Sequence, residues 1–227
     1  MQTYLITGAA QGLGKVLSKQ LVAKGHQVIL LDKELKALNA LYDELNSNLV
    51  ALYPIDLLGA NIDHYQALEN TIAEEYGQLN GVILNAAILP AFTPIENFEY
   101  MQWYEVLHTN LNANFHLIQH TLTLLKKAKN SILLAVLDEN IDLHPAYYGA
   151  YGVAKAGLKQ LMITVAAEHK NNDLNVYNAT LETFATEARG RLFPGENPLD
   201  LITAESMAER ILESLLNAKE HPSIRCL

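Results

Sequence analysis

The stretch TGAAQGLG, residues 7–14, follows the apolar run TYLI and precedes the helix-like stretch KVLSKQLVAKG. It brings three glycines, Gly8, Gly12 and Gly14, into one turn of the chain. Glycine lets a backbone approach a phosphate closely, and the following helix would aim its amides and positive dipole at that phosphate. A tight strand-to-helix turn would look similar, and the G-x-x-x-G-x-G spacing is not the general dinucleotide fingerprint. The stretch therefore indicates a nucleotide phosphate site or a plain helix start.

The sequence beyond this turn alternates apolar, strand-like runs with amphipathic, helix-like stretches. Near-continuous apolar strands are buried on both faces, and their alternation with helices implies right-handed βαβ units in a parallel sheet. Because neither a linker nor an internal repeat interrupts the pattern, we expect one α/β domain over 1–227 with a sheet of six to seven strands. The expected strands are 3–7, 26–32, 49–56, 81–87, 131–138 and 174–180, with 224–227 as a candidate seventh; the expected helices are 16–25, 35–45, 62–76, 100–129, 151–169 and 204–219.

The longest irregular stretch is the segment 181–202, which contains two glycines and two prolines. It follows a predicted strand, and open α/β sheets bind ligands beyond the carboxyl ends of their strands. We therefore interpret the segment as a candidate substrate lid, with an ordinary surface connection as the alternative.

Composition narrows the class of protein. The chain has 227 residues, half of them hydrophobic and 18% charged, as in an ordinary globular domain. A net charge of -9 without a Lys/Arg cluster argues against a nucleic-acid surface. The single cysteine, Cys226, favours a reducing, cytoplasmic compartment, and no apolar run approaches the roughly 18 residues of a membrane span. His116 and His120 are four residues apart but lack an H-E-x-x-H pattern, so we expect no metal site.

Asp32 strengthens the nucleotide hypothesis. It ends the second predicted strand, 24 residues after Gly8. A carboxylate at this point can accept hydrogen bonds from both adenosine ribose hydroxyls and would repel a 2′-phosphate. An ordinary turn acid at the strand end is the alternative.

A family resemblance rests on an ordered set of motifs: TGAAQGLG, Asp32, Asp56 in PIDL, NAA at 85–87, Asn110 in HTNLNANF and YGVAK at 151–155. Order and spacing resemble those of the short-chain dehydrogenase/reductase family over nearly the whole chain. The resemblance implies a three-layer Rossmann fold with a doubly wound parallel sheet, a nicotinamide cofactor and reversible hydride transfer between carbonyl and alcohol. It also implies subunit pairing through the helices 100–129 and 151–169, as a homodimer or homotetramer.

The resemblance also implies a set of site residues. Asp56 would bind the adenine amino group beside the Leu57 backbone, Asn85 would hold the fourth strand and the cofactor ribose region, and Asn110 would anchor a water in a proton relay. The expected cofactor-binding residues are Gly8, Gln11, Gly12, Leu13, Gly14, Asp32, Asp56, Leu57, Asn85, Ala86, Ala87, Tyr151, Lys155 and Thr186, and the expected catalytic residues are Tyr151, Lys155, Asn110 and Asp138. Asp32 and Gln11 favour NAD over NADP, because NADP-preferring relatives often carry a basic residue at the position of Gln11. Lys33 argues the other way, since it could reach a 2′-phosphate if Asp32 turned away.

Tyr151 and Lys155 are four residues apart and would share one face of a helix. A free tyrosine, with a pKa near ~10, is a poor base at neutral pH. A nearby ammonium and a positively charged nicotinamide both favour the phenolate, and the lysine has further donors for the nicotinamide ribose. If the other motifs were absent, the two residues would more simply be a packed tyrosine and a surface lysine on an amphipathic helix.

Three positions depart from the family pattern. Asp138 stands where a serine normally donates to the substrate carbonyl, thirteen residues before Tyr151. An ionised aspartate can only accept, and at about 4 Å it would oppose phenolate formation by roughly 4 kcal/mol at an effective dielectric of ~20. Three explanations would reconcile Asp138 with the family pattern: it is protonated and donates to the substrate, Asn140 supplies the donor instead, or the protein no longer performs the family reaction. The plain alternative is that Asp138 only caps the turn after the strand. Leu181-Glu182 replaces a Pro-Gly pair, and Ala87 replaces a glycine.

The sequence thus favours an NAD-dependent oxidoreductase acting on a small or medium alcohol or carbonyl compound. The alternative is a catalytically impaired nucleotide-binding protein that senses cofactor state or serves as a scaffold subunit. The replacements at Asp138 and Leu181-Glu182 favour this alternative. The intact Tyr151, Lys155 and Asn110 argue against it.

Overall fold

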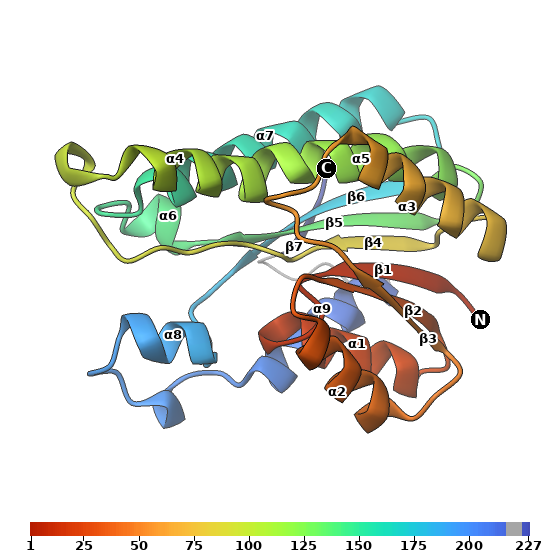
Figure 1. Ribbon diagram of the computed structural model, residues 1–227, viewed down its shortest axis with the longest axis horizontal. Coiled ribbons are helices and arrows are strands. Elements are labelled where there is room, and N and C mark those ends of the chain that lie inside the picture. Colours follow the sequence, from red (N-terminus) through yellow and green to blue (C-terminus); the bar gives the residue numbers. More distant parts are fainter. Residues whose placement is uncertain (217–223) are drawn as a thin grey trace.

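The computed structural model describes residues 1–216 and 224–227, and in it a seven-stranded sheet lies between two layers of helices (Figure 1). The strand order is β3-β2-β1-β4-β5-β6-β7. The strands are β1 (Thr3–Thr7), β2 (Gln27–Asp32), β3 (Val50–Pro54), β4 (Gly81–Leu84), β5 (Ser131–Asp138), β6 (Leu174–Leu181) and β7 (Ile224–Cys226). This arrangement confirms the predicted three-layer, doubly wound α/β fold.

The direction of the last strand differs from the all-parallel prediction. Strands β1 to β6 pair in parallel, whereas β7 pairs antiparallel with β6. Doubly wound sheets commonly carry an antiparallel strand at one edge, because an edge strand is held from one side only.

Helices cover both faces of the sheet, with α1, α2 and α9 on one side and α3, α4, α5 and α7 on the other (Figure 1). The helices are α1 (Gly12–Ala23), α2 (Leu35–Leu45), α3 (Ile62–Glu75), α4 (Tyr100–Leu107), α5 (Ala113–Leu125), α6 (Asn140–Leu143), α7 (Gly149–His169), α8 (Glu187–Leu192) and α9 (Ala204–Leu216). Short 3₁₀ turns lie at Ile95–Asn97 and Pro198–Asp200. The part of the last predicted helix beyond residue 216 lies outside the described residues.

The apolar strands supply two cores at once, because successive side chains of a strand point to opposite faces. Leu5 and Ile29 join the core under α3, α5 and α7, whereas Ile6 and Leu30 join the core under α1, α2 and α9. All six residues of β2 are buried. Continuous burial on both faces explains why the strands read as apolar runs instead of alternating ones.

The prediction of one long helix over 100–129 is wrong in two respects: the helix is interrupted in its middle, and it ends earlier than predicted. One π-helical turn, His108–Asn112, separates α4 from α5, and α5 ends at Leu125. From the first turn of α5, the side-chain amide of Asn114 donates to the backbone carbonyl of Asn110 inside the π-helical turn at 2.8 Å. An asparagine amide that bonds a helix carbonyl competes with the regular ladder, which explains the interruption.

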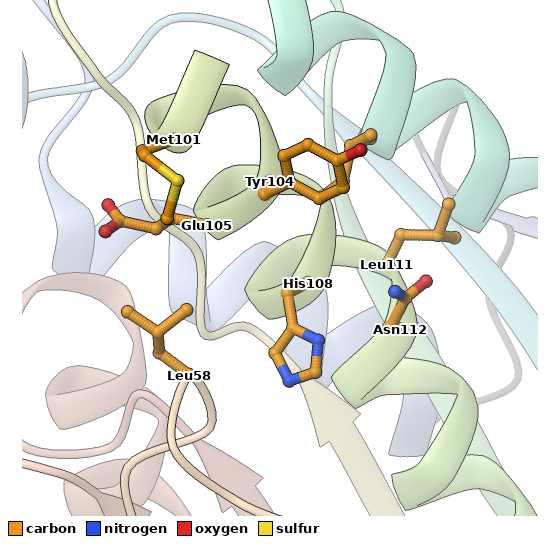
Figure 2. A pocket seen from close by; sticks show the side chains of 8 residues that line it. Leu58, Met101, Tyr104, Glu105, His108, Leu111 and Asn112 are labelled. Carbon is orange, nitrogen blue, oxygen red and sulfur yellow. The ribbon is translucent and has the colours of Figure 1, made fainter. Parts of the chain in front are cut away.

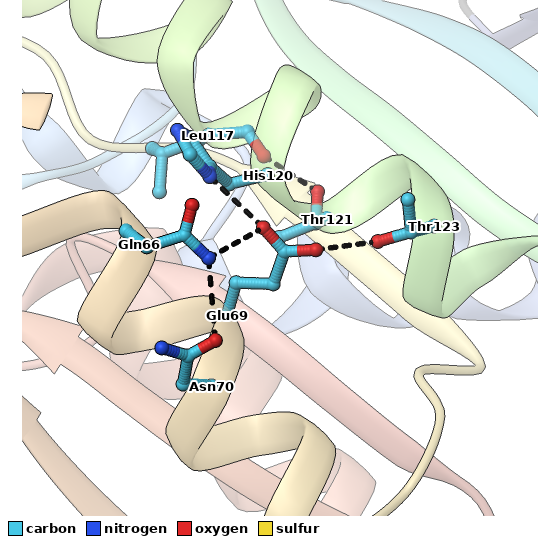
Figure 3. A network of polar contacts seen from close by, with 7 residues as sticks. All are labelled: Gln66, Glu69, Asn70, Leu117, His120, Thr121 and Thr123. Atoms are coloured by element: carbon cyan, nitrogen blue, oxygen red, sulfur yellow. Dashed lines mark hydrogen bonds and ion pairs between the residues drawn. The ribbon is translucent and has the colours of Figure 1, made fainter.

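A polar network joins α3 to α5 at the edge of their apolar contact (Figure 3). The carboxylate of Glu69 pairs with the Nδ1 atom of His120 at 3.0 Å and accepts a hydrogen bond from the hydroxyl of Thr123 at 2.8 Å. Gln66 lies at the same carboxylate, and the ring of Tyr65 stacks near His120. The network fixes the relative rotation of two helices that cover the β4 and β5 side of the sheet.

Within residues 1–216 and 224–227, no helix combines the length and apolarity needed to cross a membrane. The same part of the chain holds no cluster of three or more His, Cys, Asp and Glu residues suited to a metal ion.

Candidate active site

The glycine turn packs against the start of α1 and the end of β4. A Cβ atom on Gly14 would overlap the carbonyl oxygen of Gly8, so α1 can begin this close to the turn only with glycine at that position. Gly12 has a φ of +53°, which favours glycine, and a Cβ atom there would meet open space. The backbone at Gly12 is therefore accessible from outside.

The first turn of α1 is suited to an anion. The helix begins at Gly12, its N-cap residue Gln11 makes no side-chain capping bond, and the described first turn holds no acidic residue. The first amides of a helix lack intrahelical partners and lie at the positive end of its dipole. Gln11 and Gly12 are exposed, so the start of α1 lies at the surface beside the glycine turn. This arrangement fits the pyrophosphate of a dinucleotide.

Asp32 ties the glycine turn to the end of β2. Its Oδ2 atom accepts a hydrogen bond from the amide of Ala10 at 3.0 Å, and its Oδ1 atom accepts one from the amide of Glu34 at 3.1 Å. The residue is 8% exposed. A carboxylate has about four acceptor positions, so two remain for ribose hydroxyls. Asp32 thus acts as the turn acid and keeps the capacity that the ribose role requires.

The ends of β1 and β4 are held together by Thr7, which the sequence analysis did not single out. Its hydroxyl oxygen accepts from the amides of Asn85 and Ala86, each at 3.0 Å. The side-chain amide of Asn85 donates to the carbonyls of Thr7 and Gly8, both at 3.1 Å. Asn85 therefore holds the glycine turn as well as β4. Ala87 is exposed just beyond.

Asp56 and Leu57 lie past the end of β3, where the family resemblance places the adenine. Asp56 is exposed, and its Oδ1 atom accepts from the amide of Leu58 at 3.1 Å. Leu57 is buried in the core on the α3 side. Asp56 therefore has free acceptor capacity at the surface.

Asn110 lies in the π-helical turn and is fully buried. Its side chain accepts from the amide of Ile88 at 2.7 Å and donates to the carbonyl of Ile88 at 2.8 Å. This pair of bonds fixes the segment after β4 against the helix layer. The side chain is committed to the backbone, so a water in a relay would have to bind elsewhere on this turn.

Tyr151 and Lys155 lie on the buried face of α7, 7% and 3% exposed. The Nζ atom of Lys155 donates to the carbonyl of Val136 in β5 at 2.7 Å and lies 5.7 Å from the ring centre of Tyr151. Tyr151 belongs to a small aromatic cluster with Tyr148. Both side chains therefore meet the carboxyl end of β5, where a substrate would enter an open α/β sheet.

Burial dominates the ionisation of this pair before a cofactor binds. Burial, followed by the charge of Asp138 and then Tyr148, raises the pKa of Tyr151 well above its ordinary value. Burial lowers the pKa of Lys155 to about 8, and the charge of Asp138 opposes that shift. Without a cofactor, Tyr151 is therefore a neutral phenol, because desolvation outweighs the ammonium that was expected to favour phenolate.

Asp138 ends β5 and binds the loop that follows. Its Oδ1 atom accepts from both the backbone amide and the side-chain amide of Asn140, each at 2.9 Å. The remaining side-chain hydrogen of Asn140 points to the hydroxyl of Thr183 at 3.1 Å. Asn140 therefore does not supply the donor of the missing serine, and Asp138 does cap a turn.

The segment 181–202 is more ordered than a plain connection. Its ends meet in a bridge between Phe184 and Ile202. Thr186 caps α8 by accepting from the amide of Arg189 at 3.0 Å, and Arg189 binds the carboxylate of Glu196 at 2.7 and 3.0 Å. The loop therefore holds its own shape.

This loop reaches α7 through aromatic contacts. The ring of Phe92 lies 4.9 Å from Tyr148 and 5.2 Å from Phe193. The Arg189 guanidinium stacks on Phe193 at 3.5 Å. Burial and then the charge of Asp138 raise the pKa of Tyr148, and the charge of Arg189 opposes that shift. The loop thus covers the side of α7 next to Tyr151. Glu182 pairs with Arg210 of α9 at 2.8 Å, so its negative charge is neutralised by α9 and takes no part in the aromatic contact with α7.

A separate hollow of about 460 Å³ lies on α4 and the π-helical turn, not at Tyr151 (Figure 2). Leu58 lies below Met101 and Glu105 in the view, and His108 lies to the right of these three side chains (Figure 2). It is lined by Leu58, Met101, Tyr104, Glu105, Leu107, His108, Leu111 and Asn112. Its lining is mainly apolar, and it borders the Asp56–Leu57 segment.

The sequence did not reveal the structural roles of four residues around the site: Thr7, Asn114, Asn140 as a hydrogen-bond partner of Asp138, and Arg189. Thr7 opens the quoted TGAAQGLG stretch, and the three asparagines in HTNLNANF are an available signal for a helix interruption. Arg189 gives no such signal, because its contacts depend on the folding of the loop.

The site residues fit a nicotinamide dinucleotide. The uncapped first turn of α1 suits its pyrophosphate, Asp32 has acceptors for a ribose, and the buried Tyr151 and Lys155 lie at the carboxyl end of β5. Such a cofactor supplies hydride transfer to or from a carbon atom.

The chain matches known proteins along most of its length. A family model described as short chain dehydrogenase matches residues 2–197. The uncharacterised oxidoreductase YciK of Escherichia coli K12 is 29% identical over 202 residues, which cover 88% of this chain and 80% of that protein.

Solved structures agree with this match. A short-chain dehydrogenase of Escherichia coli CFT073, complexed with NADPH, is 28% identical with a TM-score of 0.90, covering 94% of this chain and 90% of the other. One from Shigella flexneri 2a, complexed with NADP, is 27% identical with a TM-score of 0.89, again covering 94% and 90%. From the matched motifs, the sheet order and the nearly complete coverage, the chain belongs to the short-chain dehydrogenase family.

Proposed function

We propose that this protein is a nicotinamide-dependent oxidoreductase that interconverts an alcohol and a carbonyl compound of small or medium size. The observation that carries the proposal is the placement of Tyr151 and Lys155, both buried, on the face of α7 that meets the carboxyl end of β5. Packing alone would not require a lysine at a position that is 3% exposed, since burying an ammonium is costly.

In this proposal, Tyr151 donates from its phenol to the reacting oxygen. Its raised pKa keeps the proton on the phenol, so it is a donor before a ligand binds. Lys155 supplies positive charge next to the phenol and donors toward a ribose. Asn110 holds the wall of the site through Ile88. The segment 181–202 would cover the substrate, with Thr186 at its first helix and Arg189 at its contact with α7.

We propose NAD as the preferred cofactor. Asp32 places a carboxylate at the end of β2, which would repel a 2′-phosphate, and Gln11 offers no positive charge to such a phosphate. The two structural relatives complexed with NADP or NADPH support the opposite preference, as does the exposed Lys33. We base the proposed preference for NAD on the charge of Asp32.

We further propose that 1–227 is one domain and that the protein forms a homodimer or homotetramer in the cytoplasm. Tyr100, Met101, Tyr104 and Phe115 expose 69, 65, 52 and 43% of their surfaces on α4 and α5. A second copy of the chain would bury this apolar face. Light scattering measures the assembly, and replacement of Met101 by glutamate should shift it toward the monomer.

Two measurements test the function. Calorimetric titration with NAD, NADH, NADP and NADPH measures cofactor choice, and cofactor absorbance in the presence of an alcohol and carbonyl panel measures turnover. Cofactor binding together with turnover of a panel member supports the proposal that the protein is an oxidoreductase. Binding without turnover of any panel member would instead support the nucleotide-binding sensor or scaffold. Failure to bind any of the four cofactors would overturn both readings.

A further inference from the structure

The reacting end of the site combines one hydrogen-bond donor with one acceptor. Tyr151 is a buried phenol with a proton to donate. Asp138, at the end of β5, is a carboxyl group with one oxygen already occupied by two N–H donors of Asn140. A carbonyl oxygen can only accept, so a site built for it would present two donors.

The second carboxylate oxygen of Asp138 is available. Within residues 1–216 and 224–227, the hydrogen bonds of the Asp138 carboxylate both end on its Oδ1 atom, which leaves Oδ2 without one. The nearby cations are committed elsewhere: the ammonium of Lys155 to the carbonyl of Val136, and the guanidinium of Arg189 to Glu196. Both still interact with Asp138 through space: burial lowers the pKa of Lys155 to about 8 although the charge of Asp138 opposes that shift, and the pKa of Arg189 is raised mainly by Glu196, with Asp138 adding to it.

An alcohol matches this pairing and a ketone does not. A hydroxyl oxygen accepts from the Tyr151 phenol while its hydrogen donates to a carboxylate. A ketone at the same place would use the phenol but would set its own lone pairs against the Asp138 oxygen. Asn140 has no free amide hydrogen to relieve that repulsion, because its second one is directed to Thr183.

Building on the proposed function, we propose that Asp138 is a catalytic base that accepts the hydroxyl proton of an alcohol substrate, so the site binds an alcohol in preference to the matching ketone. The O–H bond breaks toward the free Oδ2 atom of Asp138, and its electron pair becomes the second C–O bond. The hydride leaves carbon for the oxidised nicotinamide of the family reaction. In this step Tyr151 orients the oxygen with a hydrogen bond from its phenol.

Binding measurements test this assignment without turnover. The probes are cyclohexanol, added to protein loaded with NADH or NADPH, and cyclohexanone, added to protein loaded with NAD or NADP; neither mixture can react. Ligand-observed NMR gives the affinity of each. The variants are Asp138→Ser, which restores a donor, and Asp138→Asn, which keeps the shape. Asp142→Asn is the matched control, since Asp142 is an exposed carboxylate of the same segment paired with Lys159.

We expect wild type to bind cyclohexanol more tightly than cyclohexanone. Asp138→Ser should shift the alcohol-to-ketone affinity ratio by about tenfold or more toward the ketone, the scale of a hydrogen bond to a charged group. Asp138→Asn should shift it less, and Asp142→Asn should leave it unchanged. Initial rates should change in the same direction as the affinities, and cyclohexanol oxidation should be lost in Asp138→Ser.

Three results would overturn the inference: a ratio unchanged in Asp138→Ser, a wild type that prefers cyclohexanone, or cofactor-loaded protein that binds no cyclohexanol. Each of these leaves the proposed function standing if cofactor binding and ketone reduction by any variant are seen. Absence of cofactor binding in every variant would instead remove the proposed function itself, and the calorimetric titration separates that case.

Discussion

The Nζ atom of Lys155 donates a hydrogen bond to the carbonyl oxygen of Val136 at 2.7 Å. The bond joins α7 to β5 two residues before Asp138 and holds the ammonium 5.7 Å from the ring centre of Tyr151. The lysine is thus positioned by a strand carbonyl and not by the tyrosine hydroxyl. Its position is set before any ligand arrives, at the cost of burying a charge.

That cost should be visible in the pH dependence of stability. Burial lowers the pKa of Lys155 to about 8, whereas an unfolded lysine titrates near ~10.4. Between these values the unfolded chain binds more protons, so the free energy of unfolding rises with pH. Lys155→Met should therefore be more stable than wild type at pH 7, by up to about 3 kcal/mol, with the difference shrinking toward pH 10. Urea denaturation at pH 7, 8.5 and 10 measures this; a constant difference would contradict it.

Tyr151→Phe should lower kcat by about 10²-fold or more, because the phenol supplies the proton or hydrogen bond that the reacting oxygen needs. Cofactor affinity should change little, since the ring still packs against Tyr148. Steady-state rates and cofactor titration measure the two effects separately. Tyr147→Phe is the control, because Tyr147 is 58% exposed. Near-normal kcat in Tyr151→Phe would rule out the assigned role.

Asp32→Asn should raise NADP affinity relative to NAD by about tenfold, because it removes the charge that repels a 2′-phosphate. The substitution also weakens the bond to the amide of Ala10, so some loss of stability should accompany it. Calorimetry with both cofactors gives the ratio, and denaturation gives the stability. An unchanged ratio would mean that another residue, such as Lys33, sets the preference.

Tyr65→Phe should stabilise the protein by about 1 kcal/mol, because the Tyr65 hydroxyl is buried without a partner among the described residues. Burial also raises the pKa of Tyr65 to about 12. Above pH ~10 the unfolded tyrosine ionises while the folded one does not, so wild type should lose stability there that the variant keeps. Thermal denaturation at pH 7 and pH 10.5 checks both points, with the exposed Tyr104→Phe as control.

Gly14→Ala should destabilise the fold by about 3 kcal/mol or more, because the new methyl group would overlap the carbonyl oxygen of Gly8. Gly12→Ala should cost only about 1 kcal/mol, for its positive φ, since the space around it is open. Its methyl group would lie over the free amides of α1, so cofactor affinity should fall more than stability does. Equal losses of affinity and stability in Gly12→Ala would argue against a phosphate site there.

The sequence by itself determined the features that depend on neighbours along the chain. Apolar runs and helical spacing predicted the order of strands and helices, because burial of each element sets its own pattern. The glycine turn, Asp32 at a strand end and the four-residue spacing of Tyr151 and Lys155 were readable for the same reason. The substitution of Asp138 for a serine was visible without coordinates.

Only the tertiary structure decided the features that depend on residues distant in the chain. Asn110 lies in a π-helical turn held against Ile88, 22 residues earlier, and Lys155 bonds a strand 19 residues earlier. The antiparallel direction of β7 depends on an edge that no local pattern encodes. The ionisation of Tyr151 depends on how deeply the folded chain buries it beside Asp138, because desolvation is a property of the packed site and not of the spacing.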